Sequence, residues 1–170
     1  MKEVWFDIGI LRRDSTHLVA PVLIGASRDT IDLPANGLTA SIEGRVWRSL
    51  YANVWGVKWS DTVGFMRPQY QTRSELFIRT NLPERFPRGN FGLLFSLRHE
   101  YRSKALFPVG TTLLPASGEH SASSLLEIRI ATAVVSWQVR NVIGSRNYQF
   151  PDYLRPRTTN FYGVRWEFWN

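Results

Sequence analysis

Apolar and polar side chains alternate along most of the chain. Phe95 and Leu97, for example, alternate with Ser96 and Arg98. A period of two is the side-chain period of a β-strand, and almost no segment has the period of a helix. The pattern therefore predicts an all-β protein. The predicted strands are eight segments, residues 3–13, 38–48, 50–60, 70–81, 90–101, 123–131, 134–142 and 160–169.

The connections between these strands are alternately long and short. Residues 14–37, 61–69, 102–122 and 143–159 form the longer ones, and tight or Pro-bounded turns separate them. An antiparallel up-and-down meander would place the long loops at one end and the short turns at the other. Loops of this length are uncommon in compact soluble domains and typical of outer-membrane barrels.

A membrane barrel presents its apolar face to lipid, whereas a small soluble barrel places that face inside. Alternation alone does not distinguish the two. The predicted strands have about the 9–11 residues that a tilted strand needs to cross the hydrocarbon. Aromatic side chains also gather at the strand ends, where membrane barrels carry interfacial girdles. The candidate interfacial aromatics are Trp5, Trp47, Trp59, Tyr70, Tyr101 and Trp169.

The polar face combines charges of both signs along single strands. These charges are Glu43, Arg45, Arg73, Glu75, Arg98, Glu100, Glu127, Arg129, Arg165 and Glu167. They suit a barrel lumen, in which charges need partners or water, and they suit a solvated outer surface equally. A bilayer leaves no water for free backbone groups, so a membrane sheet must close. We therefore expect a transmembrane β-barrel of about eight strands, or part of a larger barrel.

The C-terminal segment, residues 134–170, resembles the end of TonB-dependent outer-membrane receptors. The matching positions are Asn141-Val142, Tyr148, Pro151, Arg157 and Gly163-Val164-Arg165-Trp166-Glu167-Phe168. The alternation of Tyr162, Val164, Trp166 and Phe168 resembles the assembly signal of outer-membrane barrels. The chain departs from the pattern where Trp169-Asn170 follow Phe168 and where Pro151-Asp152 replaces Pro-Gly.

This resemblance implies a location in the bacterial outer membrane and uptake of a scarce solute, such as a metal chelate or siderophore. It implies outer-membrane lipid, lipopolysaccharide and the barrel-assembly machinery as partners. A receptor of this family has about 22 strands, so eight strands would be its C-terminal part. We expect residues 1–170 to form a single barrel domain or barrel fragment. We expect neither a signal peptide nor a plug domain within residues 1–170, so TonB would be a partner only if an N-terminal part exists.

Composition excludes several other classes. Apolar residues make up 44% of the chain, which argues against bulk disorder, and there is no cysteine for a disulfide or thiolate metal site. The net charge is +7, but the arginines are scattered and no nucleic-acid-binding motif occurs, so we expect no nucleic-acid partner. Arginines in the expected loops could bind lipid phosphates or merely solvate the loops. They are Arg28, Arg67, Arg102, Arg146, Arg155 and Arg157.

No catalytic or cofactor motif stands out, so we expect no enzyme and no cofactor. His17, His99 and His120 lack the spacing of metal ligands. Glu119-His120-Ser121 contains a base and a nucleophile, but adjacency in sequence is not triad geometry. Two alternatives remain open. One is a soluble lipocalin-like barrel that binds an apolar ligand, and the other is a small structural barrel of the outer membrane.

Overall fold

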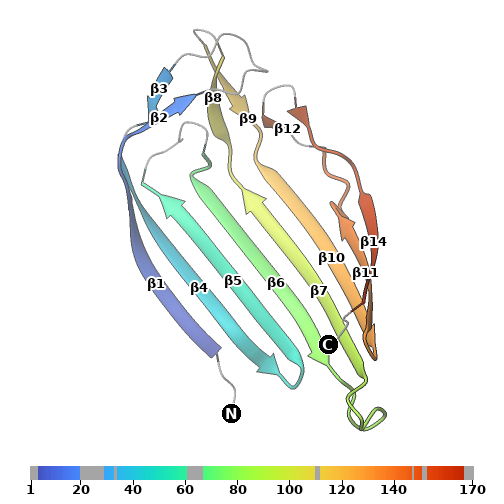
Figure 1. Ribbon diagram of the computed structural model, residues 1–170. Coiled ribbons are helices and arrows are strands. Elements are labelled where there is room, and N and C mark those ends of the chain that lie inside the picture. Colours follow the sequence, from blue (N-terminus) through green and yellow to red (C-terminus); the bar gives the residue numbers. More distant parts are fainter. Residues whose placement is uncertain are drawn as a thin grey trace.

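The computed structural model describes residues 4–19, 29–32, 34–60, 67–109, 112–146, 148–150 and 153–166. Eight strands form one antiparallel sheet (Figure 1). In spatial order they are β1 (Val4–Arg13), β4 (Ala35–Trp47), β5 (Leu50–Trp59), β6 (Tyr70–Thr80), β7 (Phe91–Arg102), β10 (Glu119–Ile130), β11 (Ala133–Arg140) and β14 (Thr159–Trp166). The described residues contain no helix that could cross a membrane. The all-β, antiparallel prediction is confirmed.

The strands follow one another as an up-and-down meander. The short turns, which include residues 48–49 and 131–132, lie at one end of the sheet (Figure 1). Arg48 and Ala131 in these turns have positive φ angles of 43° and 53°. At the other end, three of the long connections contain hairpins rather than plain loops. These hairpins are β2–β3 (Thr16–Val19 and Asp29–Asp32), β8–β9 (Ala105–Val109 and Thr112–Ala116) and β12–β13 (Tyr148–Phe150 and Tyr153–Leu154).

The sheet is not closed, and the expectation of a closed eight-stranded barrel is wrong for the described residues. Strands β1 and β14 stand at opposite edges of a curved sheet, each paired on one side only (Figure 1). An eight-stranded barrel has an interior just wide enough for its own side chains. The inward-facing rows contain Trp55, Trp59, Tyr51 and Phe77 beside several arginines, and a closed eight-stranded barrel would have to enclose all of them.

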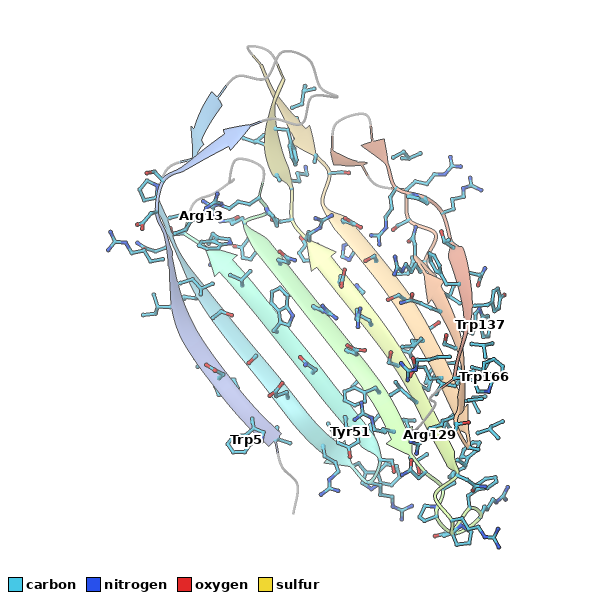
Figure 2. The ribbon with its side chains drawn as sticks, viewed as in Figure 1. Trp5, Arg13, Tyr51, Arg129, Trp137 and Trp166 are labelled. Atoms are coloured by element: carbon cyan, nitrogen blue, oxygen red, sulfur yellow. The ribbon has the colours of Figure 1, made fainter. Side chains whose placement is uncertain are left out.

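The two faces of the sheet have opposite character. Trp137 and Trp166 lie on the outside of the curve, whereas Tyr51 and Arg129 lie on the inside (Figure 2). Two residues that oppose each other in an antiparallel ladder share a face of the sheet, and successive residues along one strand alternate between the two faces. The register therefore shows on which face each of the remaining strand residues lies. We call the outer side the convex face and the inner side the concave face.

Large apolar side chains cover the convex face and are exposed. Ile10 is 82% exposed and Phe6 is 64% exposed. Further members of this face are Ile8, Leu38, Ile42, Val54, Leu76, Ile78, Leu97, Val135, Trp137, Val164 and Trp166. The described residues form only one small buried cluster, made by Ala105, Phe107 and Ala116 in the β8–β9 hairpin. The apolar side of the sheet therefore has no cover among the described residues.

Candidate functional site

The predicted lumen charges gather on the concave face. The register places Glu43, Arg45, Arg73, Glu75, Arg98, Glu100, Glu127, Arg129 and Arg165 there. Glu167 lies outside the described residues. The remaining carboxylate residues of the eight described sheet strands are Asp7 and Glu119, and both lie on the concave face as well. The sheet thus separates its carboxylates completely from its apolar side.

Strands β6 and β7 carry a ladder of ion pairs across this face. Arg98 donates from Nη2 to both carboxylate oxygens of Glu75, at 3.2 and 3.4 Å. Arg73 lies 3.8 Å from Glu100 and 3.9 Å from Glu75. The pairs form because Glu75 opposes Arg98 and Arg73 opposes Glu100 in the register. Each pair is partly solvated, so its separate contribution to stability is small.

Glu119 forms the least exposed part of this network. It is 5% exposed and makes ionic contacts with both Arg102 and Arg155. Burial lowers the pKa of the Arg155 guanidinium, Glu100 opposes that shift, and Arg102 adds to it. Around these groups lies a polar hollow of about 180 Å³. Its lining residues are Gln71, Glu100, Arg102, Glu119, Ser121 and Arg155.

Asn141 holds the connection that carries Arg155. It is 2% exposed and adopts a left-handed conformation with φ of 53°. Its Nδ2 donates to the carbonyl oxygens of Ser145 and Pro156, at 2.9 Å each. The backbone carbonyl oxygen of Asn141 accepts a hydrogen bond from Thr158 Oγ1 at 3.0 Å. One side chain thereby joins both ends of the connection between β11 and β14.

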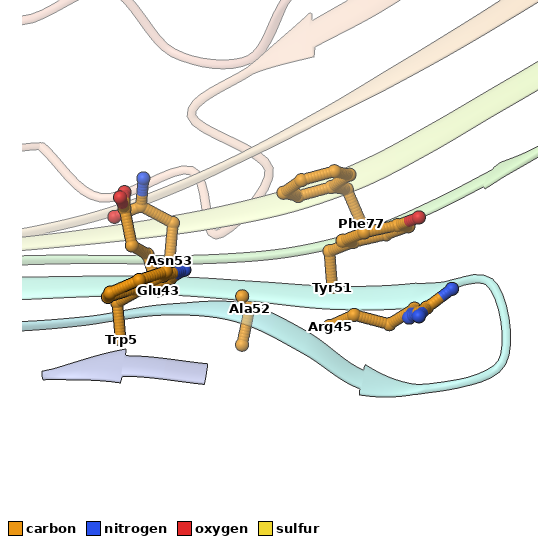
Figure 3. Close-up of a pocket in the computed structure, with 8 residues that line it drawn as sticks. Trp5, Glu43, Arg45, Tyr51, Ala52, Asn53 and Phe77 are labelled. Atoms are coloured by element: carbon orange, nitrogen blue, oxygen red, sulfur yellow. The ribbon is translucent and has the colours of Figure 1, made fainter. Parts of the chain in front are cut away.

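A second hollow, of about 340 Å³, lies near the short-turn end of the concave face. Tyr51 and Phe77 stack there with ring centroids 5.1 Å apart, and Trp5 lies beside Glu43 and Asn53 (Figure 3). The hollow thus combines stacked aromatic rings with charged and amide side chains.

The predicted interfacial aromatics divide between the faces. Tyr70 and Tyr101 lie on the convex face at the long-loop end, and Trp47 lies exposed beside the short turn after β4. Trp5 and Trp59 lie instead on the concave face, because β1 and β5 present their odd-numbered residues there. The register therefore does not place these two at a lipid interface. Trp169 lies outside the described residues.

The remaining aromatic and cationic candidates are placed as follows. In the proposed assembly signal, Tyr162, Val164 and Trp166 share the convex face, and Phe168 is outside the described residues. Arg67 stacks over the ring of Trp59, with 4.7 Å between the guanidinium carbon and the ring centroid. Arg146 and Arg157 are exposed, and Arg28 is outside the described residues.

The hypothetical base–nucleophile cluster does not assemble. Alternation along β10 places Glu119 and Ser121 on the concave face and His120 on the convex face. His120 instead lies near His99, with 5.9 Å between ring centroids. The described residues contain no group of three or more metal-ligating side chains, and the side chain of His17 is not among those described.

No protein-family model, curated protein or solved structure matches this chain. The resemblance of residues 134–170 to TonB-dependent receptors therefore stays a prediction, and the geometry of the two faces is the principal observation on function.

Proposed function

We propose that this sheet is part of the wall of a transmembrane β-barrel in a bacterial outer membrane. In this proposal the convex face contacts lipid and the concave face lines the lumen. The supporting observation is the separation of the carboxylates from the apolar side of the sheet. The carboxylates of the described sheet strands are all concave, and exposed Leu, Ile, Val and Phe side chains cover most of the convex face. Charged side chains are costly in hydrocarbon, and a bare apolar face of this extent is unusual on a soluble monomer.

The two sheet edges support a wall of more strands. In a bilayer, unpaired backbone groups have no water to bind, so β1 and β14 would each require a neighbour. Strands β1 and β14 run in opposite directions, so an even number of further strands between them would complete an antiparallel barrel. A larger bore would also accommodate Trp55 and Trp59 on the concave face.

Within this barrel we propose uptake of a scarce solute, such as a metal chelate, in the manner of TonB-dependent receptors. The motif resemblance of residues 134–170 supports it, as do the charged concave wall and the hairpins at one end of the sheet. The barrel-assembly machinery would bind the closing strand through Tyr162, Val164, Trp166 and Phe168. Coupling to TonB would require an N-terminal part with a plug.

A lipocalin-like barrel is less favoured by the curvature. Such a protein binds its ligand among apolar side chains on the inside of the curve. Here the inside of the curve carries the carboxylates of the sheet and several arginines beside its aromatic rings, while Trp137 and Trp166 lie outside the curve (Figure 2).

The absence of cysteine permits a direct test of the faces. Leu97→Cys would introduce a single thiol on the convex face, and Gln138→Cys would introduce one on the concave face. Each variant of the full chain is labelled with an environment-sensitive fluorophore and reconstituted in vesicles whose acyl chains carry bromine, a quencher. We expect strong quenching at position 97 and little at position 138. Equal quenching, or a wild-type chain that stays dissolved without lipid or detergent, would overturn the proposal.

Uptake itself needs a cellular measurement. Deleting the gene should reduce growth when the required metal is supplied only as a chelate, and free metal at high concentration should restore it. Unchanged growth across a panel of chelates, together with lipid contact at position 97, would indicate a structural barrel instead.

A further inference from the structure

A polar patch interrupts the convex face at the long-loop end. It comprises Lys58, Tyr70, Thr72, His99, Tyr101 and His120, from the adjacent strands β5, β6, β7 and β10. The register brings them together, since Lys58 opposes Tyr70, and Thr72 opposes Tyr101, which in turn opposes His120. We call this group the tyrosine–histidine patch.

The patch contains two close groups, one at Lys58 and Tyr70 and the other at Tyr101, His120 and His99. Lys58 Nζ is 5.5 Å from the ring centroid of Tyr70. The rings of Tyr101 and His120 are 4.7 Å apart, and those of His120 and His99 are 5.9 Å apart. Except for half-buried Tyr101, these side chains are exposed. The patch therefore offers an ammonium, two imidazoles and phenolic hydroxyls to a molecule on the convex side.

Two features of the surroundings limit what that molecule is. The carboxylates of the described sheet strands all lie on the opposite face, so none of them neutralises the patch from its own side. Directly beside it, Leu76 and Leu97 oppose each other and are 52% and 51% exposed. A molecule that fits this site accepts hydrogen bonds and carries negative charge at one end, and it is apolar at the other end.

We propose that the tyrosine–histidine patch binds the phosphate of a lipid headgroup, with the acyl chains lying along Leu76 and Leu97. This inference rests on the membrane location proposed above. Aromatic and basic side chains are favoured at the boundary between hydrocarbon and headgroups, where lipid phosphates lie. A free phosphate ion would contact the basic side chains of the patch but would make no apolar contact with Leu76 and Leu97.

The test measures headgroup preference beside the patch. A fluorophore at Ser74→Cys, which opposes His99, reports which lipid is adjacent. The full chain is reconstituted in phosphatidylcholine vesicles with a minor fraction of phosphatidic acid, and bromine is carried by one lipid or the other. We expect brominated phosphatidic acid to be the better quencher, with an association constant roughly five-fold higher, as expected for one basic side chain near a membrane.

The variant Lys58→Gln/His99→Gln/His120→Gln should lose this preference, while Arg85→Gln/Arg88→Gln in the exposed turn at the other end should keep it. Quenching by brominated phosphatidylcholine in both variants verifies insertion. Equal quenching by the two lipids in the wild type would overturn the phosphate site and leave the membrane location intact. Loss of the preference when inorganic phosphate is added at matching concentration would also overturn the lipid site. Absence of quenching by either lipid would overturn the membrane location itself.

Discussion

Arg155, in the connection before β14, makes an ionic contact with Glu119, the first residue of β10, on the concave face. Glu119 also contacts Arg102 at the end of β7, so a single carboxylate with little exposure serves two guanidinium groups. Asn141 holds the same connection from its other side. These contacts attach the described part of the last long connection to the sheet.

Replacing Glu119 with Gln should therefore destabilise the sheet. The substitution leaves two arginines without their shared carboxylate, and Arg102 recovers part of the loss because it is partly exposed. We expect about 2 kcal/mol less free energy of unfolding, measured by denaturant titration in detergent. Glu75→Gln, in the more exposed ladder, should lose less than about 1 kcal/mol. Equal losses of unfolding free energy in the two variants would mean that the greater burial of Glu119 does not strengthen its ion pairs.

The side-chain hydrogen bonds of Asn141 can be tested separately from its left-handed backbone conformation. Asn141→Gly keeps a residue that tolerates the φ of 53° but removes both Nδ2 hydrogen bonds. We expect a loss of about 2 kcal/mol and faster amide exchange in residues 142–146, with little change in β5 and β6. Unchanged exchange in this segment would show that other contacts hold the connection.

The strands were predictable because alternation is a local property. Residues Glu119 to Ala122 of β10 were missed as strand residues, and β8–β9 was missed entirely. The β8–β9 hairpin contains Pro108 and Pro115, and proline within a short segment usually indicates a loop or an edge strand. In residues 50–59, apolar side chains occupy both faces, so only pairing with β4 and β6 shows which face is concave.

Closure and the Glu119 site were not predictable in the same way. Whether β1 meets β14 depends on the summed curvature of the sheet and on the bulk that the concave face carries, neither of which a local pattern contains. The sequence assigned Arg155 to a loop and Glu119 to a possible catalytic cluster. Their contact depends on how the last connection folds back, which is a long-range property of the chain.

The turn between β10 and β11 offers a stabilising substitution. Ala131 has a φ of 53°, where a β-carbon is disfavoured and glycine is not. Ala131→Gly should raise the free energy of unfolding by about 0.5–1 kcal/mol, after allowing for the greater flexibility of glycine in the unfolded chain. Thr132→Gly, at the neighbouring turn position, for which no positive φ is found, is the matched control and should destabilise slightly. A loss of stability in Ala131→Gly would mean that the turn conformation is not strained.

The final prediction separates water from lipid as the environment of the convex face. Leu97 is 51% exposed, so in water a lysine there should change the free energy of unfolding by no more than about 0.5 kcal/mol. In the hydrocarbon of a bilayer the same lysine should destabilise by about 2–4 kcal/mol. Gln138→Lys adds the same charge on the concave face and should have little effect in either environment.

The measurement is denaturant unfolding of the full chain reconstituted in phospholipid vesicles, and the informative quantity is the difference between the two lysine variants. A large loss for Leu97→Lys alone identifies the convex face as lipid-facing, because a general effect of added positive charge would appear in both variants. A small loss in both would require that water or another protein covers Leu97. If another protein covers Leu97, the exposed apolar rows around Leu76 and Ile78 would form the interface with it.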